Sequence, residues 1–290
     1  MTPTLVRQHP VTGQASRVDF SARARDWSEI QERMLVPLYE AVYERLDVGP
    51  GARLLGLGCG SGLALLMAAS RGAQVAGVEA GSPERLTLAR ERLAGETRST
   101  REGADAPALG GSLGELDSRT GRGGAPARPY DLVTAFEPIG CRAGDADGLA
   151  GLLTSAVPFA ARGAAVVLAG WGPPERCATT AVLRVADKLA DPSRGAGRWR
   201  PALRDDLEEV AERAGLRPDG SGRVACPFGY AGLDSAVRGL LSTGLFDAAV
   251  AATDPAQVEE ELREALRPYR RPDRTVWMPN VFRYLVARVP

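Results

Sequence analysis

The chain has 290 residues, enough for one sizeable α/β domain with additions, and its 36 basic and 36 acidic side chains cancel to a formal net charge of zero. This balance gives no electrostatic case for a nucleic acid or an acidic membrane as partner. The four cysteines form no C-x-x-C pair, and no apolar run approaches the roughly 18 residues that a membrane span needs. We therefore expect a cytoplasmic protein with no metal site, no disulfide framework and no secretory signal.

The N-terminal region divides into an arm and a helical segment. Residues 1–19 are mostly polar, contain prolines and lack periodicity, which predicts a flexible arm. Residues 20–49 carry apolar side chains at three- and four-residue spacing from Trp27 to Leu46, which predicts a helix. Pro37 lies inside this apolar stripe, so we expect a kink or two shorter helices.

A glycine-rich turn separates the first predicted strand from a helix. An apolar strand at 54–57 leads into the G-x-G-x-G turn of residues 58–62, and an apolar helix follows at 63–69. Glycine tolerates positive φ and lets a ligand approach the main chain, and the N–H groups that open the helix suit an anionic or carboxylate-bearing ligand. The dinucleotide fingerprint fails because its third glycine would fall on Ser61 or Leu63, and no P-loop lysine follows the turn.

The second predicted strand, residues 74–80, is apolar and ends with the carboxylate of Glu79. This acid follows the glycine turn at nearly the ~20-residue spacing at which an acidic strand end meets ribose hydroxyls in α/β nucleotide sites. A carboxylate accepts two hydroxyl hydrogen bonds there, and its charge strengthens both. Ser82 and Pro83 suit the N-cap and the first position of the helix that follows.

The remaining segments alternate between strands and helices. We expect a third strand at 97–102, a long mobile loop at 110–129, a central fourth strand at 130–139 and a fifth strand at 164–169. Helices are expected at 149–161, 179–189 and 202–214, a sixth strand at 217–226, a helical region within 233–266 and the last strand from residue 280. This alternation predicts a doubly wound parallel α/β sheet with its ligands at the carboxyl ends of the strands.

The first strand, the glycine turn at 58–62 and the acid Glu79 together resemble class I S-adenosylmethionine-dependent methyltransferases, in the form that acts on small molecules of actinobacterial secondary metabolism. The resemblance implies a Rossmann-like, seven-stranded, mostly parallel sheet whose last strand is antiparallel. It divides the chain into the arm at 1–19 and a single domain at 20–290. That domain comprises a helical lid at 20–49, the core at 50–226, a helical cap at 227–279 and the final strand at 280–290.

The resemblance also implies site residues. Those that would bind S-adenosylmethionine are Gly58, Cys59, Gly60, Gly62, Glu79, Ala80, Asp105, Ala106 and Phe136. Those that would meet the substrate are Phe20, Trp27, Trp171, Phe228 and Tyr230. Glu137, at the end of the central strand, is the candidate base or else a hydrogen-bond partner in the pocket, because the only histidine is His9 in the arm. The expected partner is a small molecule, and a homodimer is compatible with the sequence.

One position departs from the family pattern. Family members usually carry an acid at the end of the first strand, where this chain has Gly56. The missing charge-assisted contact to the cofactor's amino group is worth about 1.5–3 kcal/mol, so Gly56→Asp is expected to tighten cofactor binding. Two functions stay open: methyl transfer to oxygen, nitrogen or carbon of a small natural product, or a non-methylating cyclase or pericyclase of polyketide-type biosynthesis, with the cofactor structural or lost.

Overall fold

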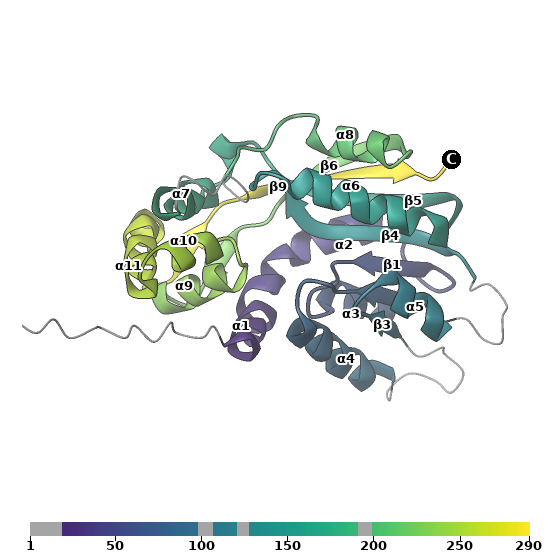
Figure 1. Cartoon of the computed structure of the whole chain (residues 1–290), viewed down its shortest axis with the longest axis horizontal. Coiled ribbons are helices and arrows are strands. Elements are labelled where there is room, and N and C mark those ends of the chain that lie inside the picture. The colour runs from purple at the N-terminus through teal and green to yellow at the C-terminus, as the bar shows by residue number, and fades with distance from the viewer. Residues whose placement is uncertain (1–18, 98–106, 121–127, 191–198) are drawn as a thin grey trace, which may run out of the picture.

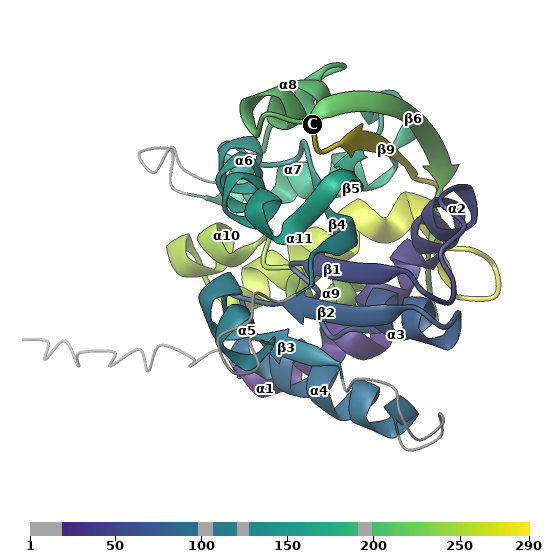
Figure 2. The same ribbon diagram turned by 90° about the vertical axis from the view of Figure 1, so that its right-hand side faces the viewer.

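A seven-stranded sheet forms the centre of the computed structural model, which describes residues 19–97, 107–120, 128–190 and 199–290. The strands are β1 Arg53–Leu57, β2 Gln74–Val78, β3 Ala108–Gly110, β4 Tyr130–Ile139, β5 Ala160–Trp171, β6 Arg217–Ala225 and β9 Val281–Arg288. They lie in the order β3-β2-β1-β4-β5-β9-β6, which Figure 2 shows from bottom to top. Strands β1 to β5 are parallel, and β9 is antiparallel to both β5 and β6. The expected α/β sheet with an antiparallel last strand is confirmed.

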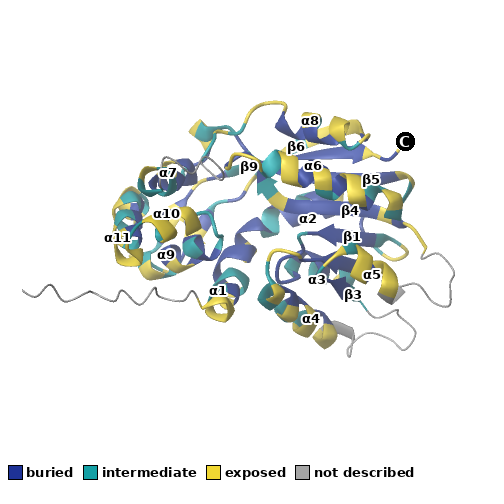
Figure 3. Cartoon of the chain, in the orientation of Figure 1, coloured by how far each residue is buried: buried dark blue, intermediate teal, exposed yellow. Residues whose placement is uncertain are grey.

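Helices cover both faces of this sheet (Figures 1 and 2). One face carries α2 Val36–Arg45, α3 Leu63–Ser70 and α4 Pro83–Thr97, and the other carries α5 Leu113–Thr120, α6 Asp145–Ala156 and α8 Asp206–Arg213. Successive strand residues point to opposite faces, so Leu54 of β1 packs into the first core and Leu55 into the second. Figure 3 shows the result: buried strands between helices whose outer surfaces are exposed.

A helical cap lies at one end of the molecule, on the left in Figure 1. It contains α7 Thr179–Leu189, α9 Leu233–Ser242, α10 Asp247–Ala252, α11 Pro255–Leu266 and the two-stranded sheet of β7 Phe228–Tyr230 and β8 Val276–Met278. Short 3-10 helices lie at Val157–Phe159, Pro174–Arg176 and Arg267–Tyr269. Because α7 packs on α10 and α11, the cap combines a helix that follows β5 with the segment between β6 and β9.

The N-terminal segment, defined here as residues 20–35, connects the cap to the sheet. Its helix α1 Phe20–Asp26 contacts both α4 and α9. A π-helix at Trp27–Gln31 and a 3-10 helix at Glu32–Leu35 then lead into α2. The expected interruption is confirmed, but it lies upstream of Pro37, which occupies the first turn of α2, where a helix tolerates the missing N–H.

Three expected boundaries are wrong. Strand β3 lies at Ala108–Gly110 and not at 97–102, because residue 97 still belongs to α4. The segment 110–129 contains α5, where the Ser112 hydroxyl accepts the Glu115 N–H at 3.2 Å and Leu116 is buried, so this segment is not a continuous loop. The helix expected at 149–161 ends at Ala156, and a 3-10 turn leads directly into β5.

Some expectations fall on residues outside the described ranges, namely the arm up to residue 18 and the candidate adenine contacts Asp105 and Ala106. Of the helices that are described, none combines the length and the apolarity that a bilayer span requires. The same described ranges contain no group of three or more histidine, cysteine, aspartate or glutamate side chains placed to hold a metal ion.

Candidate active site

The glycine turn after β1 depends on left-handed backbone. Gly58, Gly60 and Gly62 have φ values of 60°, 57° and 82°, a region that residues with a side chain rarely adopt. A Cβ on Gly62 would lie 3.0 Å from the Cβ of Ala89, so this glycine also lets α3 approach α4 closely. A Cβ on Gly60 would lie 2.9 Å from a carboxylate oxygen of Glu32. Helix α4 and the side chain of Glu32 therefore enclose the glycine turn from two sides.

Glu79, directly after β2, is bonded to two main-chain turns. Its Oε2 accepts the Gly60 N–H at 2.9 Å, and its Oε1 accepts the Gly81 N–H at 2.8 Å. The side chain is buried, and this burial raises the pKa of the carboxyl above its ordinary value. Ala80, the next residue, is exposed. The structure thus brings together the glycine turn and the acid that the sequence analysis pairs.

Glu32 is a site residue that the sequence analysis missed. It is 2% exposed, and its Oε1 accepts the Ser61 N–H at 3.0 Å. Its Oε2 is bonded to the Ser61 hydroxyl and, at 2.8 Å, to the Arg92 guanidinium. These bonds fasten the N-terminal segment to the glycine turn. The sequence carries no distinct signal for it, because Glu32 stands between Gln31 and Arg33 as one polar residue among others of an amphipathic segment.

Trp27 and Arg85 close the site from the side of the N-terminal segment. The Arg85 guanidinium lies 4.0 Å from the centroid of the Trp27 ring and donates to the Ser242 carbonyl at 2.6 Å. Burial lowers the pKa of Arg85, although the nearby carboxylates of Glu137 and Glu79 oppose this shift. The Trp27 Nε1 is buried without a hydrogen-bond partner among the described residues.

Three cavities meet at this edge of the sheet. The loop cavity, about 30 Å³, is lined by residues of the glycine turn, the N-terminal segment and the ends of β2 and β4. The edge cavity, about 450 Å³, lies between β4 and the start of α6. The cap cavity, about 60 Å³, lies between β5 and the cap. Glu137 lines all three, which places its exposed carboxylate at their junction.

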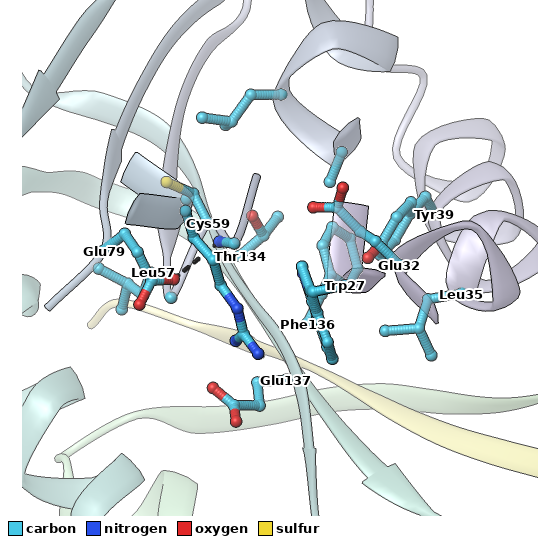
Figure 4. A pocket seen from close by; sticks show the side chains of 16 residues that line it. Trp27, Glu32, Leu35, Tyr39, Leu57, Cys59, Glu79, Thr134, Phe136 and Glu137 are labelled. Carbon is cyan, nitrogen blue, oxygen red and sulfur yellow. Dashed lines mark hydrogen bonds between the residues drawn. The ribbon is translucent and has the colours of Figure 1, made fainter. Parts of the chain in front are cut away.

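Figure 4 shows the loop cavity, with Glu79 and Cys59 on one side and Glu32 and Trp27 on the other. The cavity leaves room for about one or two water molecules, so a nucleoside enters only if the N-terminal segment moves. Three of its lining side chains are carboxylates and one is a guanidinium: Glu32, Glu79, Glu137 and Arg85. Arg92, which does not line the cavity, pairs with Glu32. The remaining excess of one carboxylate favours a cationic ligand.

Only some of the predicted cofactor-binding residues lie together at one cavity. The loop cavity is lined by Gly58, Cys59, Gly60, Glu79 and Phe136. Gly62 instead forms the N-cap position of α3, and Ala80 lies on the surface.

The predicted substrate contacts also divide into two groups. Trp27, Trp171 and Phe228 line the cap cavity. Tyr230 is not among its lining residues: it is buried, and its hydroxyl donates to Gln31 Oε1 at 2.9 Å. Phe20 is 58% exposed and lines none of the three cavities.

The cysteines near the cavities are not activated. Burial raises the pKa of the Cys59 thiol and of the Cys141 thiol to about 12. Both thiols are therefore protonated at neutral pH and are poor nucleophiles. All four cysteines are free and buried.

The space beside Gly56 is filled by Leu65. A Cβ on Gly56 would lie 2.9 Å from Leu65 Cδ2, and one on Gly77 of β2 would lie 2.6 Å from Leu65 Cδ1. An aspartate at position 56 would therefore displace a buried apolar side chain. The expected gain in cofactor binding from Gly56→Asp needs a matching change at Leu65.

No protein-family model matches the sequence, and no curated protein matches it. Solved structures do match: a candidate methyltransferase from Bacillus halodurans aligns with a TM-score of 0.51 and 15% identity over 86% of this chain and 98% of that one. YjhP from Escherichia coli gives 0.50 and 19% over 93% and 99%, and a candidate sarcosine dimethylglycine methyltransferase from Galdieria sulphuraria gives 0.50 and 14% over 91% and 98%. At sequence identities this low, the structural similarity establishes a shared fold and nothing more. The chain shares its Rossmann-like fold with these structures.

Proposed function

We propose that the protein is an S-adenosylmethionine-dependent methyltransferase that acts on a small natural-product acceptor at oxygen, nitrogen or carbon. The observation that carries this proposal is the bond from the Gly60 N–H to Glu79, which fixes the acid after β2 against the glycine turn after β1. The Rossmann-like fold shared with methyltransferases supports it. So does the acidic lining of the loop cavity, because S-adenosylmethionine carries a sulfonium and an ammonium group.

The residues present fit the cofactor chemically. Glu79 would hold the sugar hydroxyls, the glycine turn would let the ligand approach the main chain, and Phe136 would supply an apolar wall. Asp105 and Ala106 are proposed to meet the adenine, on the resemblance alone. The fit requires the N-terminal segment to withdraw from the loop cavity, since Glu32 and Trp27 fill the space beside Gly60.

When bound, the cofactor supplies an electrophilic methyl group on sulfur. The protein's own contribution would be to orient the acceptor and exclude water, which can supply much of the acceleration of a displacement reaction. Glu137, at the junction of the three cavities, is placed to accept a proton from the acceptor or to bind it by a hydrogen bond. Cytoplasmic location and a homodimer remain part of the proposal, and four free, buried cysteines accord with a reducing compartment.

The proposal is tested by calorimetric titration with S-adenosylmethionine and S-adenosylhomocysteine. We expect micromolar binding of both, with the cationic S-adenosylmethionine tighter, and roughly tenfold weaker binding by Glu79→Ala. Glu91→Gln, which removes an exposed carboxylate on α4, serves as the control. A wild-type protein that binds neither compound would overturn the proposal.

A second function is favoured by one specific observation. The Glu32 carboxylate of the protein itself already accepts the Ser61 N–H of the glycine turn at 3.0 Å. A cyclase or pericyclase with no reacting cofactor would have this arrangement. Assays on polyketide-type substrates discriminate between the two functions: product formed without loss of S-adenosylmethionine supports the cyclase, and methylated product supports the methyltransferase.

A further inference from the structure

Unpartnered polar atoms are concentrated at the cavities. In the described part of the chain, three buried side-chain atoms have no hydrogen-bond partner: Trp27 Nε1, Asp145 Oδ1 and Thr179 Oγ1. Each belongs to a residue that lines a cavity. Asp145 Oδ1 lies 3.7 Å from the Arg200 guanidinium, so its charge is compensated. Because buried polar groups are normally bonded, the remaining two atoms point to a ligand.

Both remaining atoms belong to residues that line the cap cavity. Thr179 is only 1% exposed, and its main-chain N–H is fixed by Asn280 Oδ1 at 3.1 Å, so its position at the start of α7 is rigid. Its hydroxyl has no such partner among the described residues. Trp27 also lines the cap cavity, but its Nε1 lies at the glycine turn, because a Cβ on Gly60 would be 3.1 Å from it. The cap cavity therefore offers one hydrogen-bonding group that the protein itself does not use, the Thr179 hydroxyl.

The rest of the cap cavity is an aromatic wall. The ring centroid of Phe282 lies 4.7 Å from that of Trp171 and 6.0 Å from that of Phe228. Trp171 and Phe228 also make an edge contact at 6.0 Å. Leu183 of α7 extends this apolar surface. Such an aromatic surface suits a ligand that contains an apolar ring system.

The cap cavity also has one charged group, which distinguishes between apolar ligands of different charge. Among the described residues that line the cap cavity, Glu137 is the only one with a charged side chain; the Arg85 guanidinium, with which it interacts, lines the loop cavity instead. The Cys141 thiol, which also lines it, stays neutral because burial raises its pKa to about 12. A carboxylate ligand would be repelled by Glu137, and an ammonium group would be attracted.

We propose that the cap cavity is the acceptor site and that it takes an apolar, ring-bearing amine, with the Thr179 hydroxyl and the Glu137 carboxylate as its polar contacts. The assignment of the cap cavity as the acceptor site rests on the proposed function. The preference for an amine can be measured without the cofactor. The cavity of about 60 Å³ is smaller than the ~150 Å³ that holds benzene in an engineered cavity, so it widens on binding. Trp27 and Leu35 line both the cap cavity and the loop cavity, so one movement of the N-terminal segment opens both.

Three probes with one ring system and different charges test the preference. The full-length protein is titrated by calorimetry with 2-(1-naphthyl)ethylamine, 2-(1-naphthyl)ethanol and 1-naphthylacetate. The amine is expected to bind at least about tenfold more tightly than the acid, with the alcohol between them, and Glu137→Gln to bring the amine within about twofold of the alcohol. Glu175→Gln, which removes an exposed carboxylate just before α7, keeps the wild-type order.

Thr179→Val tests the role of the hydroxyl, because it should raise the stability of the free protein and weaken binding of the amine. Valine has the same shape but removes an unpartnered buried polar atom, so the melting temperature of the free protein rises while the amine binds at least about fivefold more weakly. Thr180→Val, the neighbouring buried threonine that does not line the cap cavity, leaves amine binding unchanged. The inference is overturned if no probe binds at millimolar concentration, if the acid equals the amine, or if Thr179→Val binds the amine as the wild type does. Titration with S-adenosylhomocysteine distinguishes this inference from the proposed function. If the protein does not bind S-adenosylhomocysteine but still prefers the amine, only the proposed function is overturned.

Discussion

The carboxylate of Glu32 lies 3.0 Å from the amide nitrogen of Ser61, and this contact joins the N-terminal segment to the glycine turn. A charged donor, Arg92, bonds the other carboxylate oxygen at 2.8 Å. The turn that would receive a ligand is therefore held closed by a side chain of the protein itself. Opening it means exchanging these bonds for bonds to the ligand and to water.

Weakening this contact should loosen the N-terminal segment. Glu32→Gln loses the ion pair with Arg92 and is expected to lower the free energy of unfolding by about 1–3 kcal/mol. Cleavage by trypsin after Arg33, an exposed residue beside the contact, should become faster. Urea unfolding and timed proteolysis measure the two effects. Glu29→Gln, which changes an exposed acid on the same segment, should leave both unchanged, and an equal response of the two variants would contradict the role of Glu32.

The glycine turn should not tolerate a methyl group at its centre. Gly60→Ala places a Cβ at a φ of 57° and 2.9 Å from Glu32 Oε1 and 3.1 Å from Trp27 Nε1. We expect a loss of about 1–3 kcal/mol in the free energy of unfolding. Gly151→Ala is the control, because that glycine lies inside α6 with no atom near its Cβ position and should gain about 0.5–1 kcal/mol. Chemical unfolding of both variants checks the opposite signs.

The pH dependence of stability should carry a contribution from Glu79. Burial raises the pKa of this carboxyl above 4.5, so the folded protein binds the proton more tightly than the unfolded chain does. The stability that this group contributes is complete below pH 4.5 and is lost as the pH rises through the raised pKa. Glu79→Gln cannot titrate and should remove this part of the pH dependence. Urea unfolding at intervals from about pH 4 to about pH 7 measures it, and identical slopes for the variant and the wild type would speak against the burial effect.

Restoring an acid at the end of β1 should require two changes. Gly56→Asp alone places a Cβ 2.9 Å from Leu65 Cδ2 and is expected to cost about 1–3 kcal/mol of stability. Gly56→Asp combined with Leu65→Ala provides space, and the double variant should bind S-adenosylmethionine more tightly than Leu65→Ala alone. Titration of the four proteins of this cycle gives the coupling. A double variant that binds no more tightly than Leu65→Ala alone would mean that the acid does not reach the cofactor, and an additive cycle would mean that Leu65 does not hinder it.

The sequence predicted the parts of the site that depend on neighbouring residues. The strand, glycine turn and helix at 53–70 are a local pattern, because apolar strand residues, positive-φ glycines and a helix start each have their own composition. The acid after β2 was predictable for the same reason. The central strand β4 matched its expected range of 130–139, since most of its residues from Leu132 to Phe136 are apolar and it follows a polar segment.

The parts that were missed depend on contacts between distant segments. Glu32 and Arg92 lie far apart in the chain, and each reads as an ordinary polar residue of a helical segment until the fold joins them. Thr179 gave no signal because one hydroxyl at the start of a helix is usually a cap. Leu65 filling the space beside Gly56 followed from packing between β1, β2 and α3, which no local pattern contains.

The most direct test of the central claim is a crystal structure of the protein soaked or grown with S-adenosylhomocysteine. We predict that the ligand lies against the glycine turn with its sugar hydroxyls on Glu79, and that Trp27 and Glu32 have moved away from Gly60. A ligand bound elsewhere, or crystals in which saturating ligand leaves Glu32 on Ser61 and the loop cavity closed, would contradict a cofactor site at this edge of the sheet.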